Sequence, residues 1–157
     1  GNESVIETKD LVKKVIILGL CYVVVYFMFG YFIAWQFGEV RVFYSGNAIK
    51  TSFIEKLILN YKEDAIIYPF QFLRGVLFTL SIMPLVYMMK GKNKAILTSL
   101  CLVYLCPAVA LIIPNVLFPD TVRWAHFIEM VISMFCFAVI SWYVIVYNRD
   151  CKTSNSR

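Results

Sequence analysis

The sequence is poor in charged residues and in metal-binding side chains. Of its 157 residues, 15 are lysine or arginine, 10 are aspartate or glutamate, and a single one is histidine. A di-metal helical bundle uses two Glu-x-x-His pairs and further carboxylates, which this chain cannot supply. The five cysteines form no C-x-x-C pair, which argues against a membrane thiol oxidoreductase. We therefore expect neither a bound metal nor a cofactor.

Long apolar runs dominate the rest of the sequence. The chain is 61% hydrophobic with a mean hydropathy of +0.73, whereas an ordinary soluble domain is roughly 45–50% apolar. A helix needs about 20 residues to cross the hydrocarbon core of a bilayer, and the runs are apolar on all sides, unlike the helices of a soluble bundle. We predict an all-α polytopic membrane protein with four transmembrane helices: Val15–Trp35, Tyr68–Met89, Ala95–Phe118 and Val122–Val146.

The distribution of lysine and arginine predicts the orientation. Nine of them fall in the lead-in 1–14, the loop between the second and third runs, and the tail 147–157, which share one side of a four-pass bundle. Because basic residues mark the cytoplasmic side, we predict cytoplasmic termini around a membrane domain 15–146. The net charge of +5 then serves orientation and contact with anionic lipid headgroups. It does not indicate nucleic-acid binding.

The first outer loop contains an amphipathic segment. Between residues 47 and 61 the apolar side chains recur at helical spacing, and Asn47 is a suitable N-cap. We predict one amphipathic helix over 47–61, lying in the outer membrane interface with its apolar face down. A lid resting on the bundle is the alternative.

Ionisable residues inside the apolar runs are few, and two of them share a depth. Arg74 and Glu129 each lie about two helical turns, roughly 9 Å, below the outer ends of their helices, so we predict that they pair. The i, i+3 spacing places Arg123, His126 and Glu129 along one helix face. We expect an outward-facing polar pocket with the following lining and rim: Gln71, Arg74, Arg123, His126 and Glu129, with Trp35, Gln36 and Asn115.

This pocket suggests binding of a small anionic or amphipathic, lipid-like ligand, for sensing, transport or delivery. Three alternatives remain open. In the first, the Arg74–Glu129 pair serves only as a structural link between helices. In the second, the chain is a non-catalytic subunit or assembly partner in a membrane complex, and in the third it is a membrane-embedded enzyme that uses His126 and Glu129 as an oriented base. The expected partners are membrane lipids, the ligand, and a homo-oligomer or larger complex.

Several short motifs resemble those of a family of small, uncharacterised four-helix bacterial membrane proteins. They are Tyr31-Phe32-x-Ala34-Trp35-Gln36, Arg41-x-Phe43-Tyr44-x-Gly46, Gln71-x-x-Arg74-Gly75, Pro114-Asn115 and Val122-Arg123-x-x-His126-x-x-Glu129. The resemblance covers residues 31 to about 145 and carries no known activity. It implies a bacterial inner membrane as the setting. It also implies that the glutamine, arginines, histidine and glutamate named above form one constellation.

Overall fold

The computed structural model describes residues 8–89, 93–114 and 116–147, and within them all regular structure is helical. The elements follow in this order: α1 (Thr8–Phe32), η1 (Ala34–Gln36), α2 (Gly38–Ser45), α3 (Phe53–Glu63), α4 (Ile67–Met88), α5 (Asn93–Val109), η2 (Ala110–Ile112), α6 (Asp120–Trp142) and η3 (Tyr143–Tyr147). The prediction of an all-helical chain is confirmed for this part of the sequence.

Four of these helical segments are long and apolar enough to cross a membrane: Asp10–Gln36, Ile67–Met88, Asn93–Ile112 and Asp120–Val146. They match the four predicted runs to within two residues at most ends, with two larger differences. Helix α1 begins at Thr8, inside the predicted lead-in, and the ion pair between Asp10 and Lys14 (3.1 Å) supports this first turn. The third segment ends at Ile112 rather than Phe118, because Pro114 follows and disfavours a helical conformation in the residue before it.

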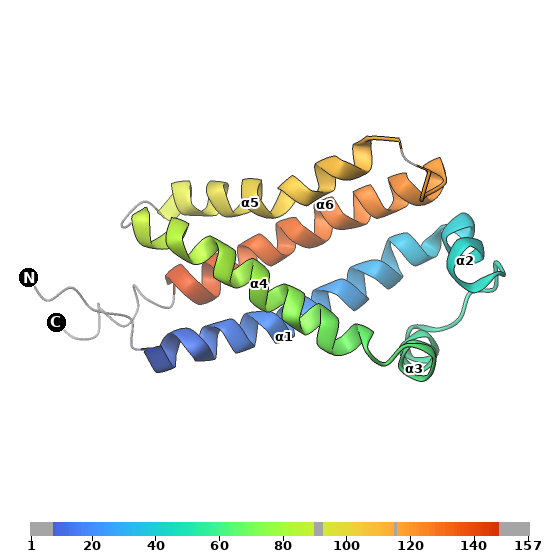
Figure 1. Cartoon of the computed structure of the whole chain (residues 1–157), viewed down its shortest axis with the longest axis horizontal. Helices are drawn as coiled ribbons and strands as arrows, with labels where there is room; N and C mark the ends of the chain where they lie inside the picture. Colours follow the sequence, from blue (N-terminus) through green and yellow to red (C-terminus); the bar gives the residue numbers. More distant parts are fainter. Residues whose placement is uncertain (1–7, 90–92, 115, 148–157) are drawn as a thin grey trace, which may run out of the picture.

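The four long helices pack in two close pairs, α1 against α4 and α5 against α6, and α1 also packs on α6 (Figure 1). Two glycines, Gly19 and Gly75, lie where α1 and α4 cross in close contact. A Cβ atom on Gly75 would lie 2.5 Å from the Tyr22 Cβ and 3.1 Å from the Gly19 Cα. Small residues at such crossings let two backbones approach in the way that membrane helices commonly use.

The core of the bundle is aromatic and apolar. Tyr104 and Phe137 are completely buried and stack with ring centroids 5.1 Å apart, and Tyr22 meets Phe137 edge-on at the same distance. The Tyr104 hydroxyl donates a hydrogen bond to Ser141 Oγ (3.4 Å), which satisfies its polar atom inside the core. Large apolar side chains also cover the outside of the bundle, including Leu20 and Val24 of α1.

The two short helices α2 and α3 lie at the opposite end of the bundle from the beginning of α1 (blue) and the end of the segment that continues α6 (red) (Figure 1). The single helix predicted over 47–61 is wrong in its bounds. Residues 38–45 already form α2, which ends at Gly46 with a left-handed φ of 72°, and α3 begins only at Phe53. Its N-cap is Ser52, not Asn47, because Ser52 and Glu55 form a capping box that satisfies two free backbone N–H groups.

Candidate functional site

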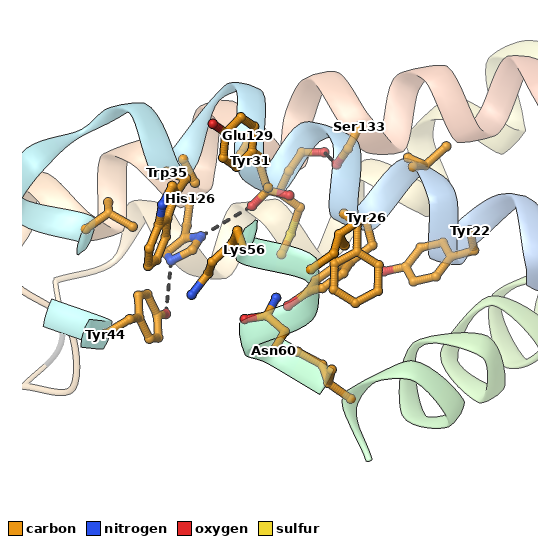
Figure 2. A pocket seen from close by; sticks show the side chains of 18 of the residues that line it. Tyr22, Tyr26, Tyr31, Trp35, Tyr44, Lys56, Asn60, His126, Glu129 and Ser133 are labelled. Carbon is orange, nitrogen blue, oxygen red and sulfur yellow. Dashed lines mark hydrogen bonds and ion pairs between the residues drawn. The ribbon is translucent and has the colours of Figure 1, made fainter. Parts of the chain in front are cut away.

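A cavity of about 640 Å³ opens among α1, α2, α3, α4 and α6 at this end of the bundle (Figure 2). Its size falls within the range typical of small-molecule sites, about 300–1,000 Å³. The wall is largely aromatic and apolar. The polar and charged side chains among its lining residues are Tyr22, Tyr26, Tyr31, Trp35, Tyr44, Lys56, Asn60, Glu63, Asp64, Arg74, His126, Glu129 and Ser133.

Helix α1 supplies one continuous wall. Tyr22, Tyr26 and Gly30 line the cavity at i, i+4 and i+8, so they share one face of the helix. A Cβ atom built on Gly30 would meet no atom within 4 Å, which shows open space directly beside this residue. Gly30 therefore leaves room in the cavity, whereas Gly75 serves helix packing.

A chain of three side chains runs along the wall formed by α2 and α6. His126 Nδ1 lies 3.3 Å from Glu129 Oε2, and His126 Nε2 lies 3.0 Å from the Tyr44 hydroxyl (Figure 2). The i, i+3 spacing on α6 brings histidine and glutamate together, as the sequence predicted. Burial, with a smaller contribution from the Glu129 carboxylate, raises the pKa of Tyr44 above its usual value. Tyr44 therefore remains a neutral phenol, and its hydroxyl can donate a hydrogen bond to the imidazole.

Helix α3 closes one side of the cavity with a lysine. Its residues Phe53, Lys56, Leu57 and Asn60 line the cavity, and the Lys56 Nζ lies 3.7 Å from the centroid of the Trp35 ring. Burial lowers the pKa of the Lys56 ammonium, and the nearby negative charge of Glu63 partly offsets this effect. In the described part of the chain, no ion pair joins this lysine to a carboxylate.

Two hydrogen bonds from tyrosine hydroxyls to backbone carbonyl oxygens, together with an aromatic contact, hold α3 and the residues before it in this position. The Tyr31 hydroxyl donates to the Thr51 carbonyl oxygen (2.7 Å), and the Tyr68 hydroxyl donates to that of Leu57 (2.9 Å). The rings of Tyr31 and Phe53 meet with centroids 5.2 Å apart. The sequence left two placements open for this helix, one flat in the membrane interface and one against the bundle. These contacts show that the helix rests against the bundle.

Arg74 lines the cavity from α4 but is not paired with Glu129. Its guanidinium carbon lies 6.0 Å from the Tyr22 ring centroid and 5.6 Å from that of Phe78. Across residues 8–89, 93–114 and 116–147, Arg74 forms neither a hydrogen bond nor an ion pair of 4.0 Å or less. The predicted pair is wrong as a direct contact, although both side chains line the same cavity.

Three other residues predicted for the pocket do not line it. Arg123 is 4% exposed and donates to the carbonyl oxygens of Leu111 (3.2 Å) and Ile112 (2.7 Å), besides pairing with Asp120 (2.6 Å). Free carbonyl groups at the end of the α5–η2 segment attract this cation more strongly than an open cavity would.

Gln71 is buried outside the cavity lining, and Gln36 donates to the Tyr31 carbonyl oxygen (2.7 Å). Asn115 lies outside the described residues. The predicted set is thus reduced in the structure to Trp35, Arg74, His126 and Glu129.

Sequence reasoning missed Tyr44 and Lys56. The only signal for Tyr44 was the motif Arg41-x-Phe43-Tyr44, whose arginine donates to the Trp35 and Gln36 carbonyl oxygens (2.7 and 3.0 Å) and so fixes α2 against the end of α1. The amphipathic pattern of residues 47–61 places Lys56 on the polar side of the predicted helix, opposite the apolar side chains. The tertiary contacts of α3 turn this lysine inward instead.

The site combines unpaired cations with a histidine–carboxylate pair and an aromatic wall. Among the described residues no group of three or more His, Cys, Asp or Glu side chains is close enough to hold a metal ion. Such an arrangement can bind a charged group through Lys56, Arg74 or Glu129 and pack an apolar portion against the tyrosines.

Comparison with known proteins adds no further information. No family model matches the chain, and no match was found among curated proteins or solved structures. The resemblance to small four-helix bacterial membrane proteins therefore stays a prediction.

Proposed function

We propose that the chain is a multi-pass membrane protein whose four long helices span the bilayer, with both termini in the cytoplasm. The apolar outer surface of the bundle and the excess of basic residues on one side support this orientation. The bacterial inner membrane is the setting that the motif resemblance implies. In this orientation the cavity lies in the outer half of the membrane domain.

Helix α3 then lies in the outer interface as well as against the bundle. Its residues Ile54, Ile58 and Tyr61 are 62%, 49% and 65% exposed and follow one another at i, i+4 and i+7. A stripe of exposed apolar side chains on a short helix is typical of contact with the boundary between headgroups and acyl chains. The apolar face of α3 is thus shared between the bundle and lipid.

The function that the geometry supports best is binding of a small anionic or amphipathic ligand in this cavity, in the service of sensing, transport or delivery. One observation carries the proposal: Arg74 lines the cavity, and no described residue forms a hydrogen bond or ion pair with it. Ionisable side chains within membrane segments are costly and usually serve function. A ligand phosphate or carboxylate would supply the ion-pair partner that none of the described residues provides.

Thermal unfolding in an uncharged maltoside detergent tests this proposal. Lysophosphatidic acid should raise the unfolding temperature, whereas monoacylglycerol with the same acyl chain should not. The effect should disappear in Arg74→Gln, which removes the cation, and in Gly30→Leu, which places a large side chain where a Cβ atom would meet no atom within 4 Å. Equal stabilisation of wild type and both variants would contradict a site in this cavity.

The enzyme alternative has one observation in its favour, the Tyr44–His126–Glu129 chain, which resembles an oriented general base. However, Tyr44 occupies Nε2 and Glu129 occupies Nδ1, so neither ring nitrogen is free for a bound substrate. The hydroxyl of Ser133 donates to the Met130 carbonyl oxygen (3.2 Å) rather than toward the histidine. Ligand binding therefore remains the stronger proposal.

A further inference from the structure

The charges that line the cavity do not suit a simple anion. Two are cationic, Lys56 and Arg74, and three are carboxylates, Glu63, Asp64 and Glu129. A ligand with only negative charge would gain two attractive partners and face three repulsive ones. We propose that the cavity recognises a zwitterion, with a phosphate or carboxylate on the lysine and arginine and an ammonium group on Glu129. This inference rests on the proposed function and specifies its ligand.

The anionic half of such a ligand would meet two cations from different helices. Lys56 comes from α3 and Arg74 from α4, and neither has an acidic partner in the part of the chain that the structure describes. Lys56 instead lies over the Trp35 ring at 3.7 Å. Because the ammonium rests on an aromatic face, it can move to a phosphate oxygen without breaking an ion pair.

The cationic half would meet Glu129, which is 8% exposed and belongs to the cavity wall. Its Oε2 lies beside His126 Nδ1, and its other oxygen makes no hydrogen bond to the described residues. When Tyr44 donates to Nε2, the imidazole N–H lies on Nδ1 and can donate to Glu129 Oε2. One charged acceptor thus remains for a ligand N–H group, and the neighbouring tyrosine rings can also contact an ammonium.

Two kinds of ligand carry both charges, a lipid with a zwitterionic headgroup and a free zwitterion in solution. Aromatic side chains at the cavity wall, including Tyr26, Tyr31 and Phe53, provide apolar contact for an attached chain. Phosphoethanolamine, free or carrying one acyl chain, therefore serves as the probe for both kinds of ligand.

The test compares ligand affinities for the full chain purified in maltoside detergent, measured by intrinsic tryptophan fluorescence and by thermal unfolding. Lysophosphatidylethanolamine should bind about tenfold more tightly than lysophosphatidic acid with the same chain, the factor expected from one charge-assisted hydrogen bond. Equal affinities, or a preference for lysophosphatidic acid, would overturn the zwitterion and leave the proposed function standing. If neither binds, both proposals fail.

Two carboxylate variants locate the selectivity. Glu129→Gln should remove the preference for the ethanolamine headgroup while lysophosphatidic acid still binds. Glu39→Gln, which neutralises an exposed carboxylate of α2 outside the cavity lining, should retain it. A preference that survives Glu129→Gln would overturn the assignment of this residue. If Glu129→Gln does not fold, the comparison of the two lipids on the wild-type protein still tests the proposal. Competition by free phosphoethanolamine would support a soluble zwitterion, and the lack of competition would support a lipid.

Discussion

The Lys56 ammonium of α3 lies 3.7 Å from the centroid of the Trp35 ring, which belongs to the turn following α1. This contact joins the helix that closes the cavity to the bundle itself. It is also the place where a ligand anion would compete with an aromatic ring for the same cation. The stability of α3 on the bundle and the binding of a ligand are therefore linked through this one side chain.

The strength of this contact can be measured by a double-mutant cycle with Trp35→Leu and Lys56→Gln. We expect a coupling free energy of about 0.5–2 kcal/mol, because a cation over an indole ring is stabilised by that amount. Amide hydrogen exchange within α3 reports the opening of this helix. Lys62→Gln on the exposed side of α3 is the matched control and should show no coupling. Additive effects of Trp35→Leu and Lys56→Gln would indicate that the ring does not hold the lysine.

The lowered pKa of Lys56 predicts a specific pH dependence. Burial disfavours the charged ammonium, so the neutral amine is reached at a lower pH than for an ordinary lysine. In the window between the two pKa values the folded chain holds fewer protons than the unfolded one, so the closed position of α3 becomes more stable as pH rises through it. The acylation rate of Lys56, followed by mass spectrometry, should have its midpoint below the ordinary lysine value.

A bound phosphate should act in the opposite direction on the same group. An anion beside the ammonium stabilises its charged form, so lysophosphatidic acid should raise the midpoint of acylation and slow the reaction. A midpoint at or above the ordinary lysine value in the free protein would contradict the buried environment of Lys56. An unchanged midpoint on addition of the lipid would separate this lysine from the binding site.

Much of this fold follows from the sequence because hydropathy and spacing are local. The four apolar runs predicted the four long helices, and the i, i+3 spacing predicted the contact between His126 and Glu129. Arg123 shows where spacing fails. It shares that helix face, but its long side chain reaches the free carbonyl groups after α5, whose position no local pattern gives.

The position of α3 shows the same limit for a whole element. Its amphipathic pattern was visible, yet Phe53 packs on the bundle while Ile54 faces outward, although the two are adjacent on one apolar face. The rotation of the helix depends on its tertiary partners, above all Tyr31 and Tyr68. The inward position of Lys56, one of the two lysine or arginine side chains that line the cavity, follows from that rotation.

Gly75 and Gly30 predict opposite responses to the same substitution. Gly75→Ala places a methyl group 2.5 Å from the Tyr22 Cβ, so the α1–α4 pair must separate, with a loss of about 1–3 kcal/mol typical of overpacking. Gly30→Ala meets no atom within 4 Å and gains helix propensity, so it should leave stability unchanged or slightly improved. Titration with a denaturing detergent measures both. Similar losses in the two variants would contradict the close crossing at Gly75.

Two arginines at the cavity end of the bundle should separate stability from binding. Arg123→Gln removes charged hydrogen bonds to the Leu111 and Ile112 carbonyl oxygens, and we expect a loss of about 1.5–3 kcal/mol in unfolding free energy. Its affinity for lysophosphatidic acid should not change, because Arg123 does not line the cavity. Arg74→Gln should do the reverse: binding falls while stability changes little. The substitution removes contacts of the cation with the Tyr22 and Phe78 rings, but no hydrogen bond or ion pair to a described residue. Denaturing titrations and binding curves on the same two proteins give both quantities. A large loss of stability in Arg74→Gln would instead make this residue a structural link between helices, and the case for a ligand anion would lose its main support.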